Sequence, residues 1–319
     1  MVGAISESSY IDQAELAGKE LQELTPQEMD KNWNIQNYFG HIKVITTDTK
    51  SDRFRRCTEE LKKIGLHPEN YEVVRGKIGS SLKKSIWQRM VRWGTEELRK
   101  KDTIKRLQGQ AGCFMSQYKA IKDTVEQFRV ATGRLNFIRG NKQTSLKDLR
   151  DATNEVRKYS SVLIIEDNTG FGRVTGKNSA DLSMYGMLFR KTMKDLKSDW
   201  DMFYFMTMND ATVVSENIAL LHYGLTTKCF AINHTMYERV LQALEIINMT
   251  DKELRPVDHE IASLHASCNA YVALPSLSYR FGSTSEVFSH LSEPFLSKIQ
   301  NWQPEVNLVE PIKISEDTE

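Results

Sequence analysis

The stretch that indicates the fold class most directly is Ser161-Val-Leu-Ile-Ile-Glu-Asp-Asn168. Its first half is a continuous apolar run, which is typical of a strand buried on both faces of an α/β sheet. Its second half is acidic and polar, and ligands of open α/β sheets bind just beyond the carboxyl ends of the strands. The stretch therefore predicts a central strand and a candidate site at the end of that strand.

A strand, a helix and a second strand are predicted on the N-terminal side of this stretch. The first strand is His41-Ile-Lys-Val-Ile-Thr46. Ser51 or Asp52 can cap the helix that follows, and Gly65 can end it. Residues 71–74 predict the second strand. Because a strand, a helix and a strand at this spacing open a βαβ unit, we expect an α/β fold with a Rossmann-type mixed sheet flanked by helices.

Further helices and strands follow from apolar periodicity. One amphipathic helix is predicted by apolar residues at helical spacing, namely Phe114, Tyr118, Ile121, Val125 and Phe128. Other helices are expected over residues 146–156 and 236–247, and other strands over residues 202–206, 228–232 and 271–274. Residues 131–160 and 207–224 are expected to be rich in loops.

Charge separates the ends of the chain from its centre. The 319 residues carry 43 Lys and Arg against 42 Asp and Glu, and this balance excludes a uniformly basic nucleic-acid binder. Residues 1–30 contain seven acidic residues and one lysine. We therefore expect an acidic N-terminal appendage over residues 1–40, a single catalytic domain over residues 41–290 and a C-terminal tail over residues 291–319.

Cysteine usage and hydropathy bear on the compartment. The four cysteines, at positions 57, 113, 229 and 268, form no Cys-x-x-Cys pair, so neither a zinc site nor a disulfide framework is expected. Neither a secretory signal nor a membrane-spanning segment is predicted. We expect a cytoplasmic protein, with a peripheral place at a membrane or secretion as an effector as alternatives.

The acidic end of the central strand is the first candidate site. Glu166 and Asn168 point to the same side of an extended chain, and both can offer oxygens to Mg²⁺ or Mn²⁺. The alternative interpretation is a plain turn, since Asp, Asn and Gly are common turn residues.

A basic stretch over residues 75–106 is the second candidate. It contains eleven Lys and Arg residues, with Trp87 and Trp93 between them. This composition fits contact with phosphate groups, with an anionic membrane surface or with RNA. The alternative is a solvated helix face on which the two tryptophans anchor the core.

Five segments of the chain, in order, match the motifs of one family. They are Val44 to Phe54, Gly112 to Gln117, Leu163 to Asn168, Trp200-Asp201 and Pro256 to His259. With these segments the chain resembles the family 25 glycosyltransferases, the lipopolysaccharide-biosynthesis and collagen galactosyltransferase group, over residues 41–282. Two positions depart from the family pattern, because Gln117 stands in place of a His and Asn168 in place of an Asp.

The resemblance implies a GT-A fold, a UDP-sugar donor and inversion at the sugar carbon, with Mn²⁺ or Mg²⁺ as cofactor. It implies Asp258 as the catalytic base and Glu166 and Asn168 as metal ligands. The residues implied in donor binding are Thr46, Asp52, Arg53, Ser116, Gln117 and Asp167. Asp258 could instead serve only as a helix cap.

Three hypotheses for the function follow. The first is transfer of a hexose from a UDP-sugar to an acceptor hydroxyl on a saccharide, a lipid-linked saccharide or a protein. The second is a catalytically weakened relative, which the departures at Gln117 and Asn168 favour. The third is a module that binds an anionic surface or RNA through residues 75–106, although the charge balance does not favour nucleic acid as a partner.

Overall fold

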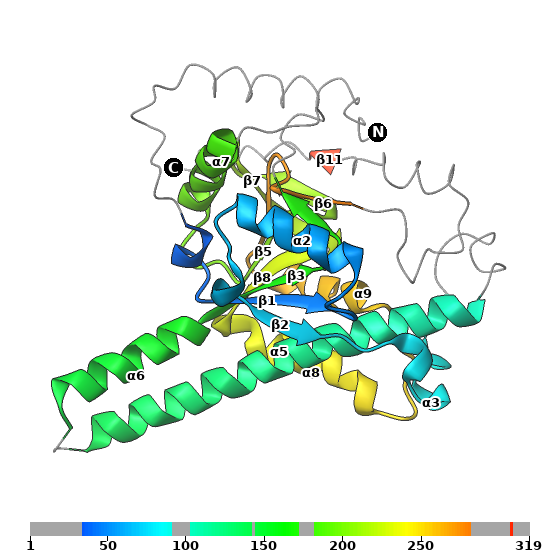
Figure 1. Cartoon of the computed structure of the whole chain (residues 1–319), viewed down its shortest axis with the longest axis horizontal. Coiled ribbons are helices and arrows are strands. Elements are labelled where there is room, and N and C mark those ends of the chain that lie inside the picture. Colours follow the sequence, from blue (N-terminus) through cyan, green and yellow to red (C-terminus); the bar gives the residue numbers. More distant parts are fainter. Residues whose placement is uncertain (1–33, 91–102, 142–143, 172–181, 282–306, 309–319) are drawn as a thin grey trace, which may run out of the picture.

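The computed structural model describes residues 34–90, 103–141, 144–171, 182–281 and 307–308. These residues form three layers, with a mixed β-sheet between two layers of helices (Figure 1). The architecture is a Rossmann-like α/β fold, as the sequence predicts.

The sheet contains nine of the described strands, in the order β11-β6-β7-β9-β5-β8-β3-β1-β2. Their bounds are β1 His41–Thr46, β2 Glu72–Arg75, β3 Ser161–Glu166, β5 Met202–Tyr204, β6 Met208–Val213, β7 Ile218–Leu225, β8 Cys229–Asn233, β9 Ala270–Ala273 and β11 Asn307–Leu308. β1 lies parallel to both β2 and β3, whereas β8 lies antiparallel to β3 and β5. The carboxyl ends of β1 and β3 therefore meet at one edge of the sheet. A separate two-stranded sheet pairs β4, Thr169–Phe171, with β10, Ser278–Arg280.

Helices cover both faces of the sheet (Figure 1). On one face lie α2, Asp52–Lys63, and α7, Leu182–Asp195; on the other lie α5, Thr103–Gly140, α8, Tyr237–Leu244, and α9, Val257–Ala262. The remaining elements are α3 Lys84–Trp87, α6 Leu146–Tyr159 and six 3-10 turns at Ile35–Asn37, Pro68–Asn70, Gly79–Ser81, His234–Met236, Glu245–Asn248 and His265–Ser267. α6 runs back along the far half of α5, and the two helices form an arm that projects past the sheet.

Alternate residues of the central strand enter two different cores. Val162 and Ile164 of β3 belong to the core under α5 and α8, and Leu163 and Ile165 belong to the core under α2 and α7. Because successive side chains of a strand point to opposite faces, an unbroken apolar run is what a strand between two helical layers requires.

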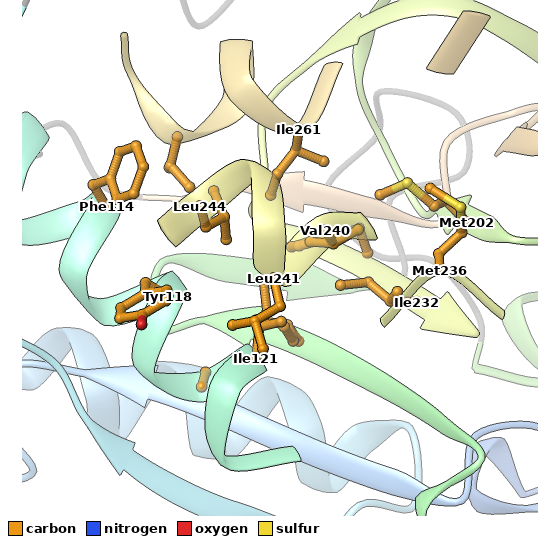
Figure 2. Close-up of a cluster of buried hydrophobic side chains, with 14 of the residues drawn as sticks. Phe114, Tyr118, Ile121, Met202, Ile232, Met236, Val240, Leu241, Leu244 and Ile261 are labelled. Atoms are coloured by element: carbon orange, nitrogen blue, oxygen red, sulfur yellow. The ribbon is translucent and has the colours of Figure 1, made fainter. Parts of the chain in front are cut away.

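The core on the α5 side brings together three helices and the sheet (Figure 2). Tyr118 and Ile121 of α5 lie against Leu241 and Leu244 of α8, and Ile261 of α9 closes the group. The predicted amphipathic helix is thereby confirmed, and at 38 residues it is longer than the predicted pattern.

Local signals set the ends of α2. The Ser51 hydroxyl accepts a hydrogen bond from the backbone N–H of Phe54 at 3.1 Å, which caps the helix. Gly65 follows the last turn with φ of 76°, a left-handed conformation that favours glycine. Cys57 and Leu61 face the core. Ser51, rather than Asp52, is therefore the cap.

A lysine lies inside the fold. The Lys43 side chain on β1 is fully buried, and its Nζ donates to the carbonyl of Ala120 at 3.1 Å and lies 3.7 Å from Glu72 Oε2. Burial lowers the pKa of Lys43, and the negative charge of Glu72 opposes this effect.

Two predictions about irregular regions are wrong. Residues 207–224 are largely the paired strands β6 and β7, and residues 131–160 are the end of α5 and all of α6 apart from the short connection between them. The β6–β7 pair was missed because polar residues such as Asn209 and Asp210 interrupt its alternation.

The packed unit extends beyond the predicted domain boundaries. Ile35 and Phe39 are buried in the core under α2 and α7, so this unit begins before residue 41. Asn307 and Leu308, in the predicted tail, pair with β6. Most of both predicted appendages lies outside the described residues. Within the described part of the chain, no helix has the length and apolar character that crossing a membrane requires.

Candidate functional site

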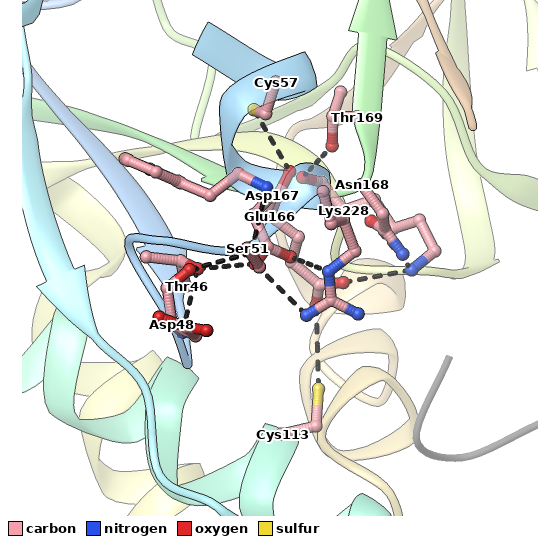
Figure 3. Close-up of polar contacts among 12 residues, drawn as sticks. Thr46, Asp48, Ser51, Cys57, Cys113, Glu166, Asp167, Asn168, Thr169 and Lys228 are labelled. Carbon is pink, nitrogen blue, oxygen red and sulfur yellow. Dashed lines mark hydrogen bonds and ion pairs between the residues drawn. The ribbon is translucent and has the colours of Figure 1, made fainter. Parts of the chain in front are cut away.

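The candidate site lies where β1 and β3 end side by side. Thr46 ends β1, Glu166 ends β3, and Asp167 and Asn168 follow directly. The backbone N–H of Asp167 donates to the carbonyl of Ile45 at 3.1 Å, which holds the two strand ends together. Figure 3 shows Cys57 of α2 and Cys113 of α5 approaching this point from opposite layers.

Asp167 is buried and fully engaged by its neighbours. Its Oδ1 lies 2.8 Å from Nε of Arg53, and its Oδ2 accepts from Arg53 Nη2 at 3.1 Å and from the Thr46 hydroxyl at 2.6 Å. Burial raises the pKa of the Asp167 carboxyl, and the charge of Arg53 opposes that rise. This two-point contact fixes the first turn of α2 against the end of β3.

Glu166 receives donors on both of its carboxylate oxygens. Oε2 lies 3.0 Å from Nζ of Lys228, and Oε1 accepts from Gln117 Nε2 at 3.2 Å and from the Cys113 thiol at 3.6 Å. Burial alone would raise the pKa of Glu166. The charge of Lys228 and the hydrogen bonds of these neighbours outweigh burial and lower the pKa below its ordinary value.

Lys228 is a site residue that the sequence analysis missed. Its Nζ also donates to Oδ1 of Asn168 at 3.4 Å, so the ammonium lies between the two predicted metal ligands. The backbone of Lys228 is fixed as well, because its carbonyl accepts from the N–H of Glu166 at 2.7 Å. Only the antiparallel pairing of β8 with β3 brings this lysine to the site, and no local sequence signal specifies that pairing.

The residues present fit a divalent ion poorly. One carboxylate, Glu166, and one amide, Asn168, face the ammonium of Lys228, which would repel a metal cation. Among the described residues, no group of three or more His, Cys, Asp or Glu side chains has the arrangement of a metal site. Mn²⁺ or Mg²⁺ at this point stays a prediction.

Gln117 links α5 to the same strand ends. Its Nε2 donates to the carbonyl of Thr227 at 3.0 Å in addition to Glu166. Its Oε1 is buried, with no hydrogen-bond partner in the described part of the chain. Gln117 therefore lies at the ends of β3 and β8, and its role in donor binding stays a prediction.

The charge of Glu166 also acts on Asp258. It is the second residue of α9 and is largely buried, and its Oδ1 accepts from the N–H of His259 at 3.1 Å. Burial raises the pKa of Asp258, and the negative charge of Glu166 raises it further. Pro256 occupies the N-cap position, so the alternative that Asp258 is the helix cap is wrong. His259 in turn shares a hydrogen bond of 2.8 Å with the hydroxyl of Tyr223.

Arg280 of β10 is another cation that the sequence analysis missed. Burial lowers the pKa of Arg280, the charge of Glu166 raises it, and the charge of Arg53 lowers it. Arg280 therefore interacts electrostatically with Glu166 and Arg53 at the ends of β1 and β3. Its pairing opposite Thr169 in the small sheet accounts for its position.

Two predicted donor-binding residues, Asp52 and Ser116, have partners within the fold. Asp52 is exposed and pairs with Arg55 at 3.1 Å, so its carboxylate does not join Asp167. The Ser116 hydroxyl donates to the carbonyl of Gly112 at 2.6 Å and accepts from the N–H of Lys77 at 2.8 Å. Ser116 thus anchors the loop after β2 to α5.

The basic stretch is partly structural. Arg89 donates to the carbonyls of Ile246, Ile247 and Lys252, Arg106 is buried, and Trp87 packs against the core under α5. Residues 91–102 of the stretch, with Arg99 and Trp93, lie outside the described residues. Trp87 therefore anchors the core, as the alternative interpretation of this stretch expects. Arg89 and Arg106 are held within the fold and do not belong to a solvated face.

No family model matches the chain, and no curated protein matches it.

Proposed function

We propose that the chain is a glycosyltransferase of GT-A-like fold, which transfers a hexose from a UDP-sugar to an acceptor hydroxyl with inversion. One observation supports this proposal above the others. The polar groups of Glu166, Asp167 and Asn168 gather with Arg53 at the carboxyl edge of the sheet, and Asp258 interacts electrostatically with Glu166. The resemblance of the five sequence segments to the family supports the same reaction.

Arg53 is the donor-binding group of this proposal. Its guanidinium has five N–H donors and uses those on Nε and Nη2 to hold Asp167, so further donors remain for a phosphate. The side chain is 30% exposed, which leaves it accessible from solvent. Thr46 and Asp167 act through Arg53, because they fix its position.

Asp258 is the base of this proposal. Its carboxylate accepts the proton of the acceptor hydroxyl, and the acceptor oxygen bonds to the anomeric carbon on the face opposite the diphosphate. The bond from that carbon to the diphosphate breaks, and its electron pair leaves on UDP. The raised pKa makes Asp258 a stronger base than an ordinary aspartate, which suits proton abstraction near neutral pH.

The first experiment is a binding and turnover panel. Thermal melting and UDP release are measured with UDP and several UDP-sugars, with and without Mn²⁺. The proposal expects a UDP-dependent rise in melting temperature and release of UDP from at least one donor. A panel with neither effect would contradict it.

Two variants on one helix locate the donor. Arg53→Gln is expected to weaken UDP binding by about 10-fold or more, because it removes a charge-assisted contact with phosphate. Arg55→Gln is the matched control, since Arg55 is exposed and contacts Asp52 and Glu59 instead. Equal UDP affinity in both variants would move the donor away from α2.

Asp258→Asn tests the base. The variant keeps an oxygen that can accept from the N–H of His259, so it is expected to fold and to bind UDP normally. Its turnover is expected to fall by about 100-fold or more, since it cannot accept the proton. Turnover within a few-fold of the parent would remove Asp258 from the mechanism.

A catalytically weakened relative is the second candidate, and the replacement of a carboxylate by Asn168 favours it. This candidate expects a melting-temperature rise with UDP and no UDP release from any donor. The same panel therefore distinguishes it from the enzyme.

A further inference from the structure

Glu166 and Asn168 share one cationic partner, Lys228. Each of the two predicted metal ligands has an oxygen close to the same atom: Glu166 Oε2 and Asn168 Oδ1 lie 3.0 Å and 3.4 Å from Nζ of Lys228. A metal bound to both oxygens would have to occupy the space of the ammonium, because metal–oxygen distances are about 2.0–2.2 Å. Lys228 and a divalent ion therefore compete for one position.

The remaining carboxylate oxygens are also occupied. Oε1 of Glu166 accepts from Gln117 and Cys113, and both oxygens of Asp167 accept from Arg53. Every oxygen of the two carboxylates thus already has a donor or an ionic partner. A divalent ion would have to displace these contacts.

The charges of the site match an ammonium. Where two carboxylates would suit a doubly charged metal ion, Glu166 offers one negative charge and Asn168 offers none, so one ammonium balances the pair. Asn168 has an amide where the family pattern has a carboxylate. This amide is consistent with an ammonium, that of Lys228, as its neighbour.

Lys228 is held in place and still has donor capacity. Its carbonyl accepts from the Glu166 N–H at 2.7 Å and from the Thr169 hydroxyl at 3.1 Å. The turn that leads to it contains Thr226 at φ of 97°, an unusual conformation for a residue other than glycine. An ammonium has three donors, and two are used by Glu166 and Asn168, so one remains for a ligand. The side chain is 17% exposed, so a ligand can reach it from solvent.

We infer that Lys228 takes the place of the divalent ion, so that the ammonium held by Glu166 and Asn168 donates its remaining N–H to the diphosphate of the donor and binds it without a metal. The inference rests on the proposed function and names the cation of the same site. Glu166 is then a positioning residue, which acts through Lys228. When the bond to the sugar breaks, the negative charge that develops on the leaving UDP lies beside the ammonium.

The test is calorimetric titration of the full chain with UDP, in EDTA and in Mn²⁺. The parent is expected to bind UDP in EDTA with an affinity within about two-fold of that in Mn²⁺. Lys228→Met is expected to lose about 10- to 100-fold in UDP affinity, and Mn²⁺ is not expected to restore it. Lys228→Arg is expected to retain most of the affinity, because it keeps the charge. Lys147→Met, an exposed lysine on α6, is the matched control and is expected to bind UDP as the parent does.

A double variant tests the competition directly. Lys228→Met combined with Asn168→Asp removes the ammonium and restores the second carboxylate, so its UDP binding is expected to require Mn²⁺. Melting temperatures without ligand check that each variant folds, and Lys228→Gln replaces Lys228→Met if that variant does not.

The outcomes separate this inference from the proposed function. UDP binding by the parent only in Mn²⁺, or unchanged affinity in a folded Lys228→Met or Lys228→Gln variant, would overturn the role of Lys228 and leave the glycosyltransferase proposal in place. Absence of UDP binding by the parent in both EDTA and Mn²⁺ would overturn both.

Discussion

Asp258 is a carboxylate that the fold makes costly to ionise. Burial and the charge of Glu166 raise its pKa, so the folded protein holds a proton on Asp258 at pH values where the unfolded chain has released it. The stability contributed by this raised pKa is present below the unfolded pKa of about 3.9 and is lost as the pH rises through the folded value.

Asp258→Asn is therefore expected to raise the melting temperature at pH 7, because the amide carries no charge to bury. The advantage over the parent is expected to shrink as the pH falls through the folded pKa of Asp258 toward the unfolded value of about 3.9, because the buried carboxyl of the parent then becomes protonated. Melting curves of both proteins between pH 4 and pH 7 measure this difference. A variant that is less stable than the parent at pH 7 would show that the carboxylate stabilises the fold.

The contribution of His265 to the stability of the fold has the opposite dependence on pH to that of Asp258. It is buried, its Nδ1 accepts from the N–H of Gly224 at 3.1 Å, and its Nε2 lies 2.9 Å from the Tyr204 hydroxyl. Burial lowers the pKa of His265 to about 4. Because Nδ1 already accepts a hydrogen bond, the ring is neutral, and protonation would break the contact with Gly224.

The pH dependence of unfolding tests this arrangement. The unfolded chain binds a proton near pH 6.5 and the folded chain near pH 4, so stability falls as the pH drops through this window, by about 3 kcal/mol at its lower end. Urea unfolding at pH 7 and pH 5 measures the fall. His265→Gln is expected to flatten the dependence, and an equal slope in parent and variant would assign it to other groups.

At the scale of elements, α5 serves two environments along one helix. Its 38 residues span about 57 Å, at about 1.5 Å per residue. One part packs on the sheet and contributes Gln117 and Cys113 to the site, and the other part forms the arm with α6. The side-chain exposures follow this division, because Phe114 is 0% exposed and Phe137 is 76% exposed.

These two phenylalanines provide a matched pair of substitutions. Phe114→Ala is expected to cost about 3–5 kcal/mol, because it leaves a cavity in the core under α5 and α8. Phe137→Ala is expected to change the free energy of unfolding by no more than about 0.5 kcal/mol. Urea unfolding of both variants compares the costs, and similar values would mean that the arm is as tightly packed as the core.

The elements differ in how well the sequence predicts them. β3 and α2 were predicted nearly to the residue, because a continuous apolar run and the cap at Ser51 are local signals. β6 and β7 were missed because their sequences show no clear alternation of apolar and polar residues. These strands are stabilised by pairing with each other and with β9, which the local sequence does not reveal.

At the scale of the whole molecule, the two cores share the same strands. β1 contributes Ile42 to the core under α2 and α7 and Ile45 to the core under α5, so neither helical layer can leave without exposing an apolar face of the sheet. We therefore expect both layers to unfold together.

Two mild substitutions on opposite faces test this coupling. Ile121→Val on α5 and Ile42→Val on β1 are each expected to cost about 0.5–1.5 kcal/mol. Because the two residues belong to different cores, the double variant is expected to show the sum of the two costs in a single transition. Circular dichroism and tryptophan fluorescence that report separate midpoints would contradict a shared unfolding unit.

The candidate site was only partly accessible from the sequence, and the reason is topological. Glu166, Asp167 and Asn168 were found because they follow a recognisable strand. Lys228 and Arg280 were not found, since they reach the same point through antiparallel pairs that join distant segments. When long-range strand pairing brings a cation to a site, the sequence around that cation carries no recognisable signal. The polar residues at the end of a buried strand do have such a signal, because they directly follow an apolar run.

The buried lysine of β1 gives the molecule a built-in chemical reporter. An acylating reagent reaches the Lys43 amine only when β1 separates from α5, because Nζ is fully buried against the carbonyl of Ala120. The acylation rate of Lys43, measured by peptide mass spectrometry against the exposed Lys147 as an internal standard, is expected to follow the population of open molecules. Phe114→Ala is expected to accelerate acylation at Lys43 and to leave the acylation rate of Lys147 unchanged. The acylation rate of this one amine would therefore report how often β1 separates from α5, without any added label.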